Sequence, residues 1–151
     1  KSDPRALWRS QMAFRFVINK LPAGGWNVIG DLPGGTRQAF TGWGSWASTI
    51  CIVVEPTAKS LLSGRRLANM ANLDPDAPKR VVAVASKVRE DGDVEMIATG
   101  TGLEVIAVVP WDEELAEAER RQLAPIDFAP DCPAVRAVES LVERLSEEKV
   151  S

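Results

Sequence analysis

The sequence predicts an α/β fold, in which a mostly parallel sheet carries helices on both faces and forms three layers. Its apolar runs hold Val, Ile, Leu and Ala at consecutive positions, as strands do when both faces of a sheet are covered. Segments with apolar residues every three or four positions separate these runs, as in β-α-β units. The predicted strands cover residues 26–31, 49–55, 80–88 and 103–109.

The segments before and between the predicted strands have apolar residues at helical spacing, which predicts helices. Before the first strand, residues 4–21 are amphipathic, with Asp3 as N-cap and Pro4 at the first helical position. Residues 34–48 hold too many glycines for a regular helix and are predicted to form a loop or a short helix. The remaining predicted helices cover residues 57–72, 90–99, 113–122 and 134–149.

The length, the net charge and the absence of certain residue types exclude several classes of function. The 151 residues suit one domain, residues 1–151, and the net charge of −3 gives no strong case for nucleic acid as a partner. No apolar run is long enough to span a membrane and no signal peptide is recognisable, so we expect a cytoplasmic protein. Histidine is absent, which excludes Ser-His-Asp and Cys-His catalysis. Two widely separated cysteines indicate neither a disulfide framework nor a thiolate zinc site.

The stretch 26–35, WNVIGDLPGG, joins an apolar run to Asp31, Pro33 and the pair Gly34 and Gly35. At the carboxyl end of a parallel strand, such a carboxylate can hold the metal of a phosphate ligand. Glycine lets backbone N–H groups approach an anion closely. Asp, Pro and Gly are also ordinary turn residues, so the stretch is compatible with a plain turn as well. Both interpretations stay open on these residues alone.

The other predicted strands also end in polar or charged motifs: Glu55-Pro56-Thr57, Ser86-Lys87 and Pro110-Trp111-Asp112. In this order and spacing, the four motifs resemble the later part of the MinD/ParA-like P-loop ATPases. That group includes the CO-dehydrogenase accessory ATPases and other metallocentre maturation factors. The resemblance covers about residues 7–145. It implies ATP and Mg²⁺ as ligands, and a homodimeric switch that acts on a partner protein.

The resemblance also implies roles for the acid and the glycine pair. Asp31 matches the catalytic acid that holds the magnesium ion, directly or through water. Gly34 and Gly35 match the switch turn that senses the γ-phosphate through backbone N–H groups. Magnesium keeps several waters and needs few protein ligands, so one carboxylate is enough when phosphates supply the rest.

Nucleotide-contacting positions are implied at the other strand ends. Glu55 matches a position near the phosphates. Ser86 and Lys87 match the strand end that holds the adenine, where the family often has Asn-Lys or Asn-Arg; here Ser stands in place of Asn. The loop that is expected to close over the base consists of Pro110, Trp111 and Asp112.

Two family motifs are missing from these residues. No Gly-x-x-x-x-Gly-Lys-Ser/Thr phosphate loop occurs among them, and no Cys-x-Cys pair that would support metal delivery. The sequence therefore looks like the downstream portion of such an ATPase, without its first strand and phosphate loop. We expect no appreciable ATP hydrolysis by these residues alone, and an upstream phosphate-loop segment or a second copy as the completing partner.

Two further functional classes stay open on the sequence. A non-catalytic α/β interaction domain would keep the architecture and lack nucleotide binding, as the missing phosphate loop favours. A flavodoxin-like or response-regulator-like binding domain shares the fold class. The acid pair expected on a first strand of a response regulator is not seen, so this class has less support.

Overall fold

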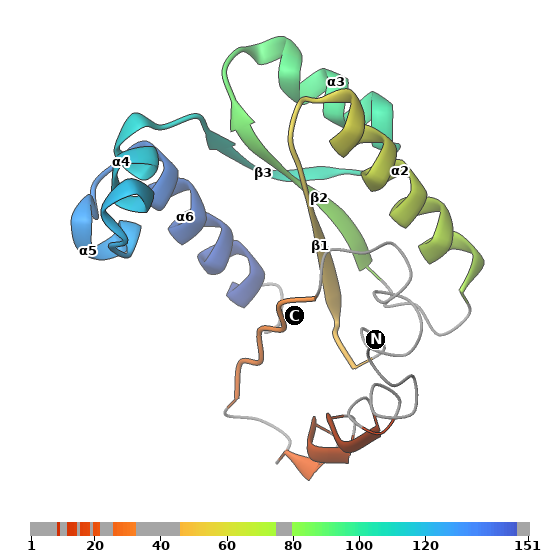
Figure 1. Cartoon of the computed structure of the whole chain (residues 1–151). Helices are drawn as coiled ribbons and strands as arrows, with labels where there is room; N and C mark the ends of the chain where they lie inside the picture. Colours follow the sequence, from red (N-terminus) through yellow and green to blue (C-terminus); the bar gives the residue numbers. More distant parts are fainter. Residues whose placement is uncertain are drawn as a thin grey trace. The chain divides into compact units, whose positions relative to one another are not determined.

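The computed structural model describes residues 9, 12–14, 16–18, 20–21, 26–32, 46–74 and 80–147 (Figure 1). The chain divides into two compact units. One contains residues 1–50 and 69–80, and the other contains residues 51–68 and 81–151. The prediction of a single domain is neither confirmed nor contradicted by this division.

A three-stranded sheet forms the centre of the larger unit. Its strands are β1 (Thr49–Val54), β2 (Arg80–Val88) and β3 (Val105–Pro110), in the order β1-β2-β3. Strands β2 and β3 are parallel, and Figure 1 shows all three strands ending at the same edge of the sheet. Three of the four predicted strands are thus confirmed, each within about two residues of its predicted bounds. The parallel α/β class is confirmed as well.

Helices connect and follow the strands in the predicted order. The predicted helices are α2 (Ala58–Leu73), α3 (Asp91–Thr101), α4 (Glu113–Arg121) and α6 (Pro133–Glu147). A short helix that was not predicted, α5 (Pro125–Phe128), lies between α4 and α6. Local residues explain three of the helix boundaries. Gly102 adopts φ 73° just after α3, Asp112 caps the start of α4, and Gln122 adopts φ 57° at the end of α4. None of the helices in the described residues is both long and apolar enough to cross a membrane.

Both faces of the sheet are covered by helices, as the near-continuous apolar strands predict. On one face, Val82, Val84 and Ile106 form a buried cluster with Leu141 and Leu145 of α6. On the other face, a side chain at Gly64 of α2 would lie 3.1 Å from Val54 and 2.9 Å from Thr101 of α3. Glycine thus permits the close contact of α2 with β1 and α3. Figure 1 shows α6 and the α2–α3 pair on opposite sides of the sheet.

One stripe of α6 is only partly covered. Val138 and Val142 share the helical spacing of Leu141 and Leu145, but they are 47% and 51% exposed. They line a hollow of about 730 Å³ between α6, α5, the start of α4 and the end of β3, which we call the apolar groove. Its lining consists of Val109, Leu115, Pro125, Ile126, Ala134, Val135, Val138, Glu139, Val142 and Glu143.

The prediction of a strand over residues 26–31 is wrong. Residues 26–32 are not assigned to a strand and pair with no strand in the described part of the chain. Trp26 is 62% and Ile29 90% exposed. An apolar run becomes a strand only where a neighbouring strand supplies hydrogen bonds and the sheet covers its side chains. The described residues between 9 and 20 are helical, as predicted for 4–21.

Candidate functional site

A cavity of about 480 Å³ lies at the edge of the sheet where the parallel strands end. The carboxyl ends of parallel strands are the usual place for ligands in α/β sheets. The segments that follow β1, β2 and β3 all contribute to it, so three loops distant in sequence meet there. We call this hollow the charged cavity. Its lining consists of Glu55, Pro56, Thr57, Lys87, Arg89, Glu90, Asp93 and Trp111.

Lys87 and Glu55 form an ion pair across the ends of β2 and β1. The Lys87 Nζ lies 2.6 Å from Glu55 Oε1, and their side chains are 52% and 39% exposed. The hydrogen bond and the charge of Glu55 raise the pKa of the Lys87 amine above its ordinary value. The register of β2 on β3 is irregular between Ser86 and Val88, so Lys87 is an extra residue in a bulge.

Arg89 and Trp111 form the second charged element of the cavity. The Arg89 guanidinium lies over the Trp111 ring, 4.1 Å from its centroid. The Trp111 backbone N–H donates to the Val88 carbonyl at 2.8 Å, and its indole Nε1–H donates to Glu113 Oε1 at 2.9 Å. These bonds hold the ring at the end of β3, where a cation–π contact orders the arginine.

The loop between β2 and α3 is held by Asp93. This side chain is only 8% exposed, and its Oδ2 accepts the backbone N–H of Arg89 at 2.8 Å and of Glu90 at 3.4 Å. A carboxylate three residues into a helix that accepts these N–H groups is half of a capping box. Asp93 therefore fixes the backbone that carries Arg89.

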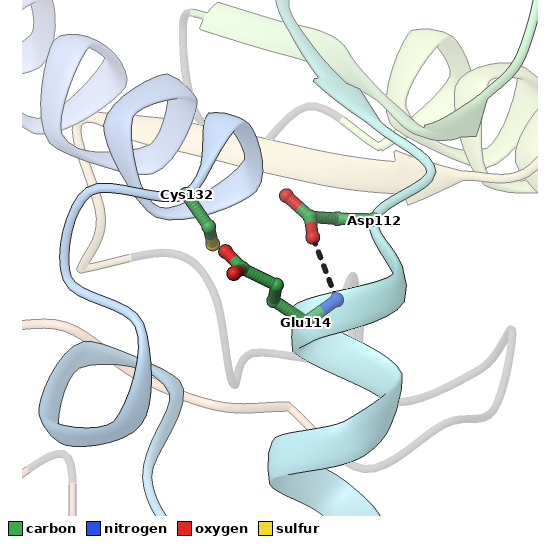
Figure 2. Close-up of side chains that lie close together, drawn as sticks. All are labelled: Asp112, Glu114 and Cys132. Carbon is green, nitrogen blue, oxygen red and sulfur yellow. Dashed lines mark hydrogen bonds between the residues drawn. The ribbon is translucent and has the colours of Figure 1, made fainter.

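Asp112 has a different surrounding from the other predicted site residues (Figure 2). Its Oδ1 accepts the Glu114 N–H at 2.9 Å and its Oδ2 accepts the Ala134 N–H at 3.1 Å, so it caps α4 and joins it to the start of α6. Burial alone would raise the pKa of the Asp112 carboxyl. The N–H bonds from Ala134 and Glu114, with contributions from Cys132 and Leu115, outweigh this and lower the pKa.

Ligating atoms of Asp112, Glu114 and Cys132 lie within 4.8 Å of one another, the spacing of a metal site. Figure 2 shows the Glu114 carboxylate near the Cys132 side chain, with Asp112 bonded to the Glu114 backbone. Because both Asp112 oxygens already accept backbone N–H groups, the cluster is explained as the junction of α4 and α6.

The structure brings together residues from three of the strand-end motifs singled out from the sequence. The charged cavity is lined by Glu55, Pro56 and Thr57 of the first motif, Lys87 of the second and Trp111 of the third. Ser86 and Pro110 lie at the ends of β2 and β3 but are not part of the lining. Asp31 is exposed and belongs to the other compact unit.

Gly34 and Gly35 lie outside the described residues. Sequence reasoning missed Arg89, Glu90 and Asp93. The Glu-x-x-Asp spacing of the last two, at the start of a predicted helix, is the signal that could have placed them at its capped end.

Comparison with known proteins gives one curated relative and several solved structures. No protein-family model matches the sequence. An uncharacterized ATP-binding protein of Methanocaldococcus jannaschii is 39% identical over 71 residues, which is 45% of this chain and 27% of that protein. The chain therefore spans only about a quarter of the length of that relative.

Two solved structures share the fold. MinD cell division protein of Aquifex aeolicus superposes with a TM-score of 0.61 and 22% identity, over 75% of this chain and 50% of that one. A ParA family ATPase of Chlorobium tepidum superposes with a TM-score of 0.54 and 18% identity, over 64% and 42%. The chain thus has the P-loop NTPase-like α/β fold of MinD and the ParA family ATPases, and resembles a part of such a protein.

Proposed function

We propose that this chain is the nucleotide-binding part of a MinD/ParA-like ATPase, and that it binds ATP in the charged cavity. One observation carries the proposal: cationic side chains and an aromatic ring meet in a hollow at the carboxyl edge of a parallel sheet. The name of the relative in Methanocaldococcus jannaschii, an ATP-binding protein, supports the same conclusion.

The residues of the cavity suit a nucleotide. Trp111 offers a ring on which a base can stack, and Lys87 and Arg89 offer cations to phosphates. A volume of about 480 Å³ lies within the range of small-molecule pockets. Glu55, which was expected near the phosphates, lines the cavity and is paired with Lys87.

The finer parts of the proposal come from the family resemblance. Asp31 would hold Mg²⁺, and its exposed carboxylate is the kind of single oxygen ligand that magnesium accepts. Gly34 and Gly35 would form the switch turn. The protein would act as a dimer on a partner protein in the cytoplasm. We expect no appreciable hydrolysis by the 151 residues alone, since phosphoryl transfer depends on positioning by a phosphate loop.

The test is an NMR titration of the ¹⁵N-labelled chain with Mg–ATP, observed at the tryptophan indole N–H signals. The chain has five tryptophans. Trp111 donates from its indole nitrogen beside the cavity, and its signal is assigned by its loss in Trp111→Phe. We expect a saturable shift of this signal with ATP, and a smaller one with inorganic triphosphate, which lacks a base.

Trp26 is the matched control, because it is exposed and not part of the cavity lining. Its indole signal should stay in place. No saturable change with ATP at any tryptophan would refute the proposal and favour the non-catalytic interaction domain. Equal ATP affinity of the wild type and Asp31→Ala in the presence of Mg²⁺ would remove Asp31 from the site.

A further inference from the structure

The ammonium of Lys87 is paired with a carboxylate of the protein itself. Glu55 Oε1 lies 2.6 Å from its Nζ, and both side chains line the charged cavity. A Lys ammonium has three donors on a compact point charge, so a ligand anion and a nearby carboxylate compete for the same group. Glu90 also lines the cavity, but it forms no ion pair with Lys87.

The backbone at Lys87 is strained where the ion pair forms. Lys87 and Gln122 are the non-glycine residues with positive φ in the described part of the chain, at 58° and 57°. Gln122 has a local reason, because it ends α4 and donates its N–H to the Ala118 and Glu119 carbonyls. Lys87 ends no helix. It is the extra residue of a bulge, and such bulges direct a side chain.

This bulge directs Lys87 toward Glu55 and the cavity. Strained backbone of this kind is found where a side chain must be held for function. The pair itself is half-exposed, and exposed ion pairs are weak and screened by salt. A triphosphate carries several negative charges and can displace one carboxylate, whereas a neutral ligand gains nothing from doing so.

We propose that Glu55 is an internal competitor for the ligand: it holds Lys87 until an anionic group of the ligand takes its place on the ammonium. Glu55 then makes the cavity selective for polyanionic ligands, whose several negative charges can displace it from Lys87. This inference rests on the proposed nucleotide function of the same cavity, and it gives Glu55 a role opposite to direct ligand binding.

The test compares Glu55→Gln with Glu90→Gln, Lys87→Met and the double variant Glu55→Gln/Lys87→Met. Glu90→Gln is the matched control, because it removes the same charge from the same cavity without touching the ion pair. Affinities for ATP and for neutral adenosine are measured from the Trp111 indole signal. Glu55→Gln should tighten ATP binding by about two- to five-fold, the range for an exposed pair, and leave adenosine binding unchanged.

The double variant and the control decide the mechanism. In the Lys87→Met background, Glu55→Gln should give no gain, since the ammonium for which it competes is gone. An equal gain in Glu90→Gln, or a gain that persists without Lys87, would show that only net charge matters and would overturn the inference. Unchanged or weaker ATP binding in Glu55→Gln would overturn it too, with the proposed function intact. No ATP binding by any variant refutes the proposed function itself.

Discussion

Two hollows adjoin the end of β3, one lined by Trp111 and the other by Val109, and their linings differ in chemistry. The charged cavity is lined by residues at or just after the ends of the strands, among them Lys, Arg and Glu side chains, and Lys87 has a strained backbone. The apolar groove is lined mainly by the apolar faces of α5 and α6. Polar groups gather where three strand ends meet, while the groove is the part of an apolar helix face that no other element covers. Changes in the cavity should alter ligand binding, and changes in the groove should not.

The largest effect on stability is expected at the junction of α4 and α6. Asp112 joins α4 to α6, so Asp112→Ala leaves two backbone N–H groups without their acceptor. We expect a loss of about 1–2 kcal/mol in the free energy of unfolding, measured by urea denaturation. Glu114→Ala is the control, because only its backbone N–H is bonded to Asp112; its cost should stay below about 0.5 kcal/mol. Equal losses would mean that the cap contributes nothing.

The aromatic ring of the cavity should show the largest effect on binding. Trp111→Ala removes the surface for base stacking and the support of Arg89. We expect ATP affinity to fall about ten-fold, in line with the loss of one stacked base. The measurement is calorimetric or fluorescence titration, with Trp26→Ala as the control. An unchanged affinity would place the base elsewhere.

The two left-handed residues offer a direct comparison of strain. Glycine adopts φ near 58° without strain, so Gln122→Gly and Lys87→Gly should each raise the melting temperature by about 2–4 °C. Only Lys87→Gly should also weaken ATP binding. If both variants leave binding unchanged, the bulge at Lys87 has no function in the cavity.

The Asp112 cap should also make stability depend on pH. Its pKa is lowered in the folded protein, so its contribution is present above the unfolded value of about 3.9. That contribution is lost as the pH falls through the lowered, folded-state pKa. Urea denaturation between about pH 5 and pH 2 should therefore show a steeper loss for the wild type than for Asp112→Ala. Parallel curves would contradict the prediction.

The smallest effect is expected in the groove. Val142 is 51% exposed, so Val142→Ser should change the free energy of unfolding by less than about 0.5 kcal/mol and leave ATP affinity unchanged. Val135, which is only 8% exposed on the same helix, is the contrasting site, and Val135→Ser should cost more than about 1 kcal/mol. A change of ATP binding in Val142→Ser would show that the two hollows are coupled.

The pattern of apolar residues by itself determined the α/β class and most element bounds. Strand β2 has the predicted bounds and α2 is shifted by one residue, because periodicity and turn residues act over short distances along the chain. It also placed Glu55, Lys87 and Trp111 at strand ends, where parallel strands bring ligand-binding residues.

Tertiary structure alone decided what these side chains touch. The Lys87–Glu55 pair, the Arg89–Trp111 stack and the Asp112 bond to Ala134, which is 22 residues away, join segments that no local pattern relates. The stretch around Asp31 differs for the same reason: its apolar residues suit a strand, but a strand exists only when another strand bonds to it. Contacts between distant segments depend on how the elements pack, and a local pattern does not contain that information.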